Sequence, residues 1–290
     1  MPPAHLLERL FASRFLVSHA QASVGVGDRR SPFTGAGLEF AEHRAYQQGD
    51  DVRRLDVRLL ARLGENYVRL YSVDRQLPIT VILDASPSMR YGSPDKFGFA
   101  ALVCQLLGFV GLVGGEQIRM GAAIGGRLRW SPRFSGPNRA HALFEWIDRL
   151  EPADGERFGA VLREARPALR RKGLVFLVSD WWDEDVDAVL DALAADGQEI
   201  VAIHVAAPEE IDPAALGSGS QVMVDAETGE ELELVLDSSA VRRYRAAFAE
   251  WTAALKRSFT RRQGRYFLVS TATSVQDFFL KDLRAAGIIT

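Results

Sequence analysis

The sequence predicts an α/β protein whose central, mostly parallel sheet is flanked by helices. From residue 77 onward, apolar runs of strand length alternate with segments of helix length, which is typical of parallel sheets. Some runs, such as Leu174–Val178, are apolar throughout and are therefore expected to be covered on both faces. The apolar share of 47% and the charged share of 25% are those of an ordinary globular protein with a full core.

The first 74 residues are expected to form an N-terminal appendage. Leu6–Val17 carries apolar residues at helical spacing and predicts an opening helix. Asp50 or Asp51 is expected to cap a short helix that Gly64 ends. Tyr67–Val73 alternates between apolar and polar residues and predicts a strand.

Residues 75–290 are expected to form one α/β domain, in which the strands alternate with helices. Strands are predicted at Ile79–Asp84, Gln117–Ile124, Leu174–Ser179, Glu199–Val205 and Arg265–Ser270, with shorter ones at Arg127–Trp130 and Gln221–Val224. Helices are predicted at Lys96–Leu112, Arg139–Leu150, Phe158–Arg171, Asp185–Ala195, Ser239–Arg262 and Val275–Ala286.

The segment Phe97–Gly115 is nearly long enough and apolar enough to span a bilayer. It contains five glycines, and it follows a strand and its loop directly. A helix that is covered by a sheet and its neighbours is also apolar all round. We therefore expect a buried helix rather than a membrane span.

The net charge argues against nucleic-acid binding, and the cysteine content indicates a reducing compartment. The formal net charge is −3, so no global positive field indicates nucleic-acid binding. The single cysteine, Cys104, lies in an apolar run and is expected to be a core residue of a protein in a reducing compartment. No signal-peptide pattern is evident at the start of the sequence, and we expect a cytoplasmic location.

Oxygen-bearing side chains follow two of the predicted strands. Asp84, Ser86 and Ser88 form an Asp-x-Ser-x-Ser run directly after the apolar stretch Ile79–Leu83, and Asp180 follows a second apolar strand. The carboxyl ends of parallel strands meet at one edge of a sheet, where ligands of such sheets bind. Carboxylate and hydroxyl oxygens are the ligands that Mg²⁺ or Mn²⁺ prefers.

Asp84 and Asp180 would repel each other if their strands are adjacent. Two carboxylates about 4 Å apart repel by roughly 4 kcal/mol at an effective dielectric constant of about 20. A proton, an arginine or a divalent cation could offset this repulsion. The nearby hydroxyls favour the cation, although simple capping of the following turns by these side chains stays an alternative.

The Asp-x-Ser-x-Ser run, with a distant aspartate after a later strand, resembles the metal-ion-dependent adhesion site (MIDAS) of von Willebrand factor A domains. The segments Gly37–Phe40, Arg44–Tyr46 and Gly49–Asp56 resemble the signature of domain-of-unknown-function family 58 (DUF58). Ile203–Val205 and Asp225–Glu230 are similar to the later part of that family. The resemblance covers about residues 35–290.

This resemblance implies a von Willebrand A-like fold and no catalytic residues. It also implies that the protein acts with a MoxR-type AAA+ ATPase in maturation or remodelling of client proteins. The implied metal ligands are Asp84, Ser86, Ser88, Glu156 and Asp180. No nucleic acid and no further cofactor are implied.

The sequence departs from the family pattern in two places, of which the second concerns the metal site. Val57 stands where family members usually carry tryptophan. Glu156 takes the place of the usual threonine ligand, so it could donate oxygen to a more anionic site. Alternatively, Arg157 could enter the pocket and replace the cation, in which case the scaffold would have lost its metal.

Other residues allow more than one interpretation. Trp181 and Trp182 could contact a partner or pack over the sheet edge. Arginines between Arg44 and Arg69 alternate with acidic residues, which favours internal ion pairs over nucleic-acid binding. An alternative function is that of a metal-dependent phosphohydrolase with Asp84 as nucleophile, although Ser86 stands where that chemistry needs a second aspartate.

Overall fold

The computed structural model describes residues 1–16, 30–31, 39–47, 50, 55–74, 77–155, 157–169, 171–182, 186–217, 219–224 and 231–290. The chain divides into two compact units. The larger consists of Met1–Leu16 and Leu77–Thr290, and the smaller of Val17–Gln76. The first sixteen residues therefore belong with the large unit, whereas the sequence analysis grouped them with the segment up to residue 74. Burial of Leu6, Leu10 and Phe15 explains this difference.

The described residues of the smaller unit form an antiparallel sheet in the order β1-β3-β2 and the helix α3. Its elements are β1 Arg30–Ser31, β2 Glu39–Ala45, α3 Val57–Leu63 and β3 Tyr67–Asp74.

The short helix α3 begins later than the sequence analysis expected. Asp56 is its N-cap, and its carboxylate accepts hydrogen bonds from the backbone N–H groups of Arg58 and Leu59. Asp50 instead accepts a hydrogen bond from the backbone of Gln47, 2.8 Å away, and Asp51 lies outside the described residues. Gly64 ends the helix in the left-handed conformation, as predicted.

The larger unit is built on a six-stranded sheet in the order β11-β8-β7-β4-β5-β6. All neighbouring strands are parallel except β5 and β6. The strands are β4 Pro78–Asp84, β5 Gln117–Ile124, β6 Arg127–Ser135, β7 Leu174–Ser179, β8 Glu199–Ala206 and β11 Arg265–Ser270. The predicted α/β class with a mostly parallel sheet is thus confirmed.

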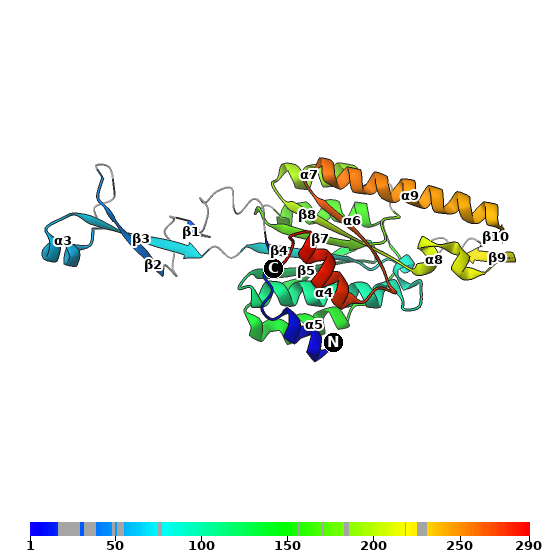
Figure 1. The fold of residues 1–290 in the computed structure, drawn as a ribbon, viewed down its shortest axis with the longest axis horizontal. Helices are drawn as coiled ribbons and strands as arrows, with labels where there is room; N and C mark the ends of the chain where they lie inside the picture. Colours follow the sequence, from blue (N-terminus) through cyan, green and yellow to red (C-terminus); the bar gives the residue numbers. More distant parts are fainter. Residues whose placement is uncertain are drawn as a thin grey trace. The chain divides into compact units, whose positions relative to one another are not determined.

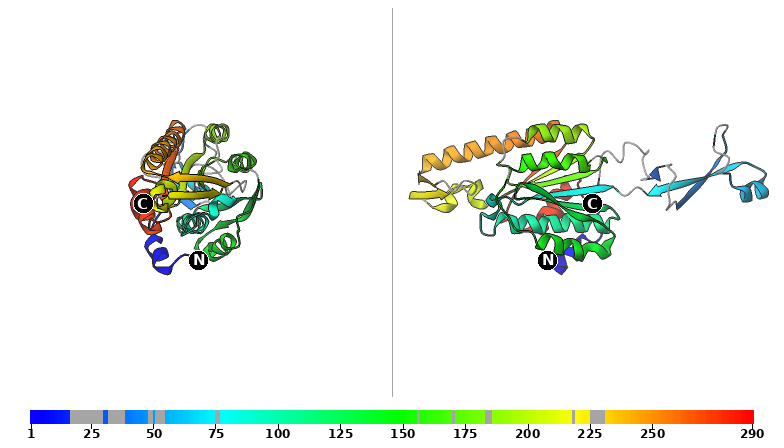
Figure 2. Two further views of the ribbon diagram at one scale, coloured as in Figure 1. Left: turned by 90° about the vertical axis from the view of Figure 1, so that its right-hand side faces the viewer. Right: turned by 180° about the vertical axis from the view of Figure 1, so that it is seen from behind.

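Helices cover both faces of this sheet (Figure 1; Figure 2). On one face, α4 packs on β4 and β5, and α1, α5 and α10 pack against α4. On the other face, α6, α7 and α9 enclose a core that includes Ile82, Leu177 and Phe259. The helices are α1 Ala4–Leu10, α4 Lys96–Val113, α5 Ala140–Asp148, α6 Phe158–Ala165, α7 Asp187–Ala195, α9 Ser238–Arg261 and α10 Val275–Asp277, which continues as a π-helix over Phe278–Leu283.

Helix α4 is the most apolar helix of the described chain. By length and composition it is the one described helix that could cross a membrane, yet 78% of its residues are buried within the structure.

Two glycines allow helix α4 to pack closely against its neighbours. A Cβ at Gly111 would lie 2.2 Å from Ile118 Cδ1, and one at Gly108 would lie 2.6 Å from Leu143 Cδ1. Cys104 is buried in this helix, as expected of a core residue.

Beyond β8 the chain forms the short helix α8, Pro208–Ile211, and then a hairpin of β9, Gly219–Val224, with β10, Glu231–Leu236. The sequence predicted part of β9 but not β10, in which most side chains are exposed. Several other bounds also differ from expectation. β6 continues to Ser135, and the predicted helix Phe158–Arg171 ends at Ala165 and continues as a 3-10 turn over Arg166–Leu169.

Candidate functional site

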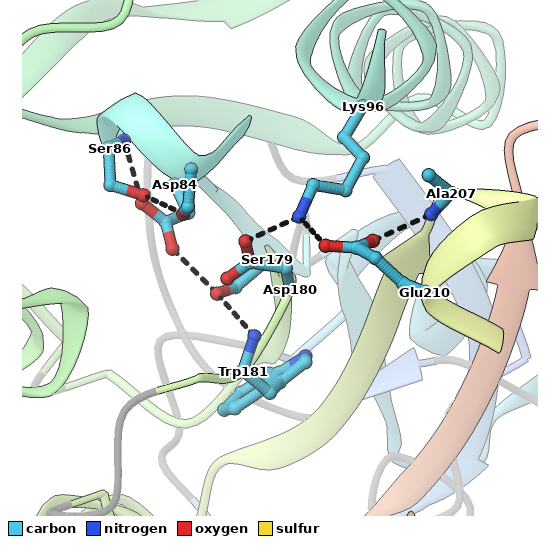
Figure 3. Close-up of polar contacts among 9 residues, drawn as sticks. Asp84, Ser86, Lys96, Ser179, Asp180, Trp181, Ala207 and Glu210 are labelled. Carbon is cyan, nitrogen blue, oxygen red and sulfur yellow. Dashed lines mark hydrogen bonds and ion pairs between the residues drawn. The ribbon is translucent and has the colours of Figure 1, made fainter. Parts of the chain in front are cut away.

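Asp84 and Asp180 end two neighbouring strands of the sheet. β4 and β7 pair in parallel with Leu83 opposite Val178, so the two acidic residues follow at the same carboxyl edge. Both side chains are buried (Figure 3). The sequence-based expectation that these strand ends converge agrees with this register.

The carboxylate of Asp84 is held by two donors. The backbone N–H of Ser86 donates to Oδ1 over 3.0 Å, and the hydroxyl of Ser179 donates to Oδ2 over 2.6 Å. Burial raises the pKa of Asp84 well above its ordinary value, and the negative charge of Asp180 raises it further, whereas the hydrogen bond from Ser179 opposes the rise. No basic side chain of the described residues pairs with Asp84.

The two serine hydroxyls lie next to this carboxylate, in the turn that follows β4. Ser86 Oγ and Ser88 Oγ are 3.0 Å apart, and both residues are half-buried. The hydroxyl of Ser86 does not cap the 3-10 turn Pro87–Arg90, although it stands at the N-cap position. The loop that precedes α6 packs beside them, because the N–H of Ala153 donates to the carbonyl of Ala85 over 3.0 Å.

Asp180 is paired with a buried lysine. Lys96 Nζ lies 2.8 Å from Asp180 Oδ2 and 2.6 Å from Glu210 Oε1. Glu210 also accepts a hydrogen bond of 2.7 Å from the backbone N–H of Ala207 (Figure 3). Burial alone would lower the pKa of Lys96, but the carboxylates of Asp180 and Glu210 raise it above its ordinary value, so the ammonium stays charged.

Lys96 is therefore the cation that neutralises Asp180. Arg157, the other candidate for such a role, is exposed at the start of α6. Glu156, the predicted substitute for the threonine ligand, lies outside the described residues. The sequence did hold a signal for Lys96, because a lysine that opens an otherwise apolar, buried helix needs an acidic partner.

The two adjacent tryptophans differ in exposure. Trp181 is 1% exposed, has a backbone φ of 60°, and packs edge-on against Phe158 and Phe259 at 5.8 and 5.0 Å between ring centroids. Trp182 is 49% exposed and stacks on Trp251 at 4.4 Å. Only Trp182 is thus available to a partner at this edge without a change of conformation.

His204 on β8 is a core residue. It is 1% exposed, and its Nδ1 lies 2.6 Å from the hydroxyl of Tyr266. Burial lowers the pKa of His204 to about 3, so the ring is neutral near pH 7. It is therefore not placed to serve as an accessible acid or base.

The oxygen atoms at the carboxyl edge of the sheet are only partly suited to binding a hard cation such as Mg²⁺. Among the described residues, no three His, Cys, Asp or Glu side chains converge as metal ligands. Asp180 is engaged by Lys96, which leaves Asp84, Ser86 and Ser88 as oxygen donors. Each Asp84 oxygen accepts one hydrogen bond and keeps a further lone pair. Mg²⁺ keeps several waters in its shell, so three protein oxygens are sufficient for a weak site.

Residues 42–258 match the protein family described as "Protein of unknown function DUF58". The chain belongs to this family. The DUF58 match contains Asp84, Ser86, Ser88, Lys96, Asp180 and Glu210, so the whole carboxyl edge described above lies within it.

This DUF58 chain is 29% identical over 222 residues to the "Uncharacterized protein Mb1516" of Mycobacterium bovis and, equally, to the "Uncharacterized protein Rv1480" of Mycobacterium tuberculosis. Each alignment covers 73% of this chain and 68% of the relative.

Solved structures that match part of this chain include BatB from Bacteroides thetaiotaomicron and an aerotolerance-related membrane protein from Bacteroides fragilis. Each has a TM-score of 0.45 and 14% identity. Each match covers 72% of this chain, and it covers 98% of the first structure and 99% of the second.

Proposed function

We propose that this DUF58 protein is a non-enzymatic binding module of the von Willebrand A type, which contacts partner proteins through the carboxyl edge of its sheet. The observation that carries the proposal is the convergence of Asp84 with the hydroxyls of Ser86 and Ser88. The indole of Trp182, exposed just after β7, adds an apolar contact of the kind enriched at binding hot spots.

The environment of Asp84 favours binding over catalysis. A carboxylate nucleophile needs an accessible oxygen and a neighbouring acid or base. Asp84 accepts hydrogen bonds from Ser86 and Ser179, neither of which is a general acid or base, and His204 on β8 is buried and neutral. The phosphohydrolase alternative is further weakened by Ser86, which cannot act as a general acid or base.

In this proposal a divalent ion, Mg²⁺ or Mn²⁺, would be held by Asp84, Ser86 and Ser88. It would supply an open coordination position for a carboxylate of the partner. Asp180 would act at a distance, through its pair with Lys96. Asp84 has no positive partner among the described residues, so a divalent cation or a proton could offset its buried charge.

The partner that we propose is a MoxR-type AAA+ ATPase together with a client protein, in the cytoplasm. This assignment is supported by the DUF58 signature and not by any contact in the structure. An ATPase partner would also supply the nucleotide chemistry that the chain lacks, since its sequence holds no Gly-x-x-x-x-Gly-Lys-Ser/Thr run.

The experiment is a binding measurement between the full chain and the MoxR-type ATPase of the same organism, with Mg²⁺ and with EDTA. We expect Asp84→Asn and Ser88→Ala to weaken binding about tenfold or more, because each removes a donor of the proposed site. The matched control is Asp277→Asn, an exposed aspartate paired with Lys281 on α10.

Isothermal titration with Mn²⁺, without the ATPase, tests the metal separately. Equal ATPase binding by the wild type, Asp84→Asn and Asp277→Asn would refute the proposed binding edge. If Asp84→Asn abolished ATPase binding but EDTA did not change the binding of the wild type, the proposed binding edge would stand. The metal would then have no part in it.

A further inference from the structure

A small cavity lies at the amino-terminal end of the sheet, opposite to the edge described above. Its volume is about 70 Å³, and its walls include the first residues of β4 and β5 and the turn after α6. Three of its lining residues are arginines: Arg119 on β5, Arg133 on β6 and Arg171 after the 3-10 turn. Among the described residues that line it, none is acidic. The cavity is thus a small space with concentrated positive charge.

Arg119 and Arg133 face each other across two strands. They are direct partners in the antiparallel register of β5 and β6. Like charges in this position destabilise a sheet. Burial lowers the pKa of Arg119, and the charge of Arg133 lowers it further. Within the described part of the chain, no carboxylate forms an ion pair with Arg119, Arg133 or Arg171, so the repulsion has no internal compensation.

The guanidinium group of Arg119 is also held in place. Its Cζ lies 4.2 Å from the ring centroid of Trp130, which is a cation–π contact. Its Nε atom is buried and has no hydrogen-bond partner among the described residues. A buried donor without an acceptor is costly, and a ligand oxygen would satisfy it. Thr80 lines the same cavity and adds a hydroxyl.

We propose that this cavity binds a phosphate-type oxyanion, either free or as the end of a small phosphate monoester. Guanidinium groups present paired N–H donors that match phosphate oxygens. The volume admits one phosphate group, so the remainder of a larger ligand would lie outside. A doubly negative ion between Arg119 and Arg133 would replace their repulsion by two attractions. This site is independent of the proposed binding edge.

The test uses the full chain with inorganic phosphate, glycerol 3-phosphate, and sodium chloride at matched ionic strength. Isothermal titration and the thermal midpoint are the measurements. We expect phosphate to raise the midpoint above that in chloride, and Arg133→Gln or Arg171→Gln to weaken phosphate binding about tenfold each. Both arginines are exposed, so these variants are expected to fold. Arg129→Gln, an exposed arginine of β6 outside the cavity, is the matched control.

The proposal predicts that phosphate reverses the order of stability of Arg133→Gln and the wild type. Without phosphate, Arg133→Gln should be at least as stable as the wild type, because the opposed charge is gone; with phosphate it should be less stable. Tighter binding of glycerol 3-phosphate than of phosphate would indicate a monoester ligand, and equal binding a free oxyanion. Stabilisation by phosphate no greater than by chloride, or equal phosphate affinity in Arg133→Gln and Arg129→Gln, would overturn the proposal.

Discussion

Lys96 is a buried ammonium group between two carboxylates, Asp180 and Glu210. Moving an ion pair from water into a protein interior is costly, and the cost is offset only when each charge finds good partners. Here the ammonium has an oxygen on either side at 2.8 and 2.6 Å, and Glu210 is held in turn by the backbone of Ala207. The network joins the ends of β7 and β8 to the start of α4.

Replacing Lys96 with methionine is therefore expected to destabilise the protein strongly. The buried carboxylate of Asp180 and the partly buried carboxylate of Glu210 would be left without a positive charge, and breaking one partner of a buried ion pair costs about 3 to 5 kcal/mol. Urea unfolding at pH 7 measures the change. The double variant Lys96→Met/Glu210→Gln should recover part of the loss, because it removes one of the two stranded charges.

Lys281→Met is the control for this prediction, because Lys281 forms an exposed pair with Asp277 on one helix. Its loss is expected to stay within about 0.5 kcal/mol. If Lys96→Met lost no more free energy of unfolding than this control, Lys96 would not be the counter-charge that the hydrogen bonds indicate.

The residues of the site differ in how far the sequence could predict them. Asp84 and Asp180 follow wholly apolar strands, and that local pattern fixes both their place in the sheet and their common edge. Lys96 and Glu210 lie 84 and 30 positions from Asp180 and meet it only through the packing of α4 and α8. No spacing rule relates residues so far apart, so the sequence indicated that Lys96 needs an acidic partner but not which residues supply it.

At the scale of elements, the loop before α6 is held against the β5–β6 turn by close backbone contact. A Cβ at Gly155 would lie 1.9 Å from the backbone nitrogen of Gly126. The same loop donates the Ala153 N–H to the carbonyl of Ala85, next to the Asp84 turn. Gly155 therefore positions one wall of the candidate site.

Gly155→Ala should displace this loop. Relief of the overlap requires a backbone shift, and we expect a loss of about 1 to 3 kcal/mol in the free energy of unfolding. The Ala153 amide should also exchange its hydrogen faster, because its bond to Ala85 is weakened. Hydrogen exchange followed by NMR measures the second effect at that residue.

Gly98→Ala in α4 provides the comparison, since its added methyl would meet only the side chain of Asp95. Alanine favours a helix over glycine by about 1 kcal/mol, so this change should not destabilise. Unchanged exchange at Ala153 in Gly155→Ala would show that the loop adapts without leaving the turn.

Elements with a clear period or a wholly apolar run were predicted best. β5, β7 and β11 have the predicted bounds. The predictions of elements were wrong where tertiary contacts, rather than the local sequence, determine the structure. Asp56, rather than Asp50 or Asp51, caps α3, since several acidic residues compete for that role. β10 was not predicted, although Glu231–Leu234 alternates between acidic and apolar residues; most of its side chains are exposed.

At the scale of the whole molecule, the large unit is assembled from two stretches of sequence. The N–H of Leu16 donates to the carbonyl of Ile288 over 2.8 Å, and Phe15 forms a β-bridge with Ile289. The ring of Phe15 lies 5.2 Å from that of Phe176 on β7. The ends of the chain are thus joined within one core, and residues 17–76 form a separate compact unit.

Replacing residues 17–76 with a flexible Gly/Ser linker of about 30 residues should therefore leave the large unit folded. Among the described residues, the core beneath α6, α7 and α9 includes none from that segment. We expect a thermal midpoint within about 3 °C of the full chain, since 1 kcal/mol corresponds to about 2 to 4 °C at this size. Near-UV circular dichroism reports the tertiary packing.

A second variant adds Phe15→Ala to the linker variant and tests whether the first sixteen residues belong to the large core. Removing a buried phenylalanine costs about 3 to 5 kcal/mol, so the midpoint should fall by roughly 10 °C. If the linker variant itself lost its near-UV signal, residues 17–76 would have to support the large core. If Phe15→Ala left the midpoint unchanged, the first sixteen residues would not be part of that core, and the division into two units would have to be redrawn.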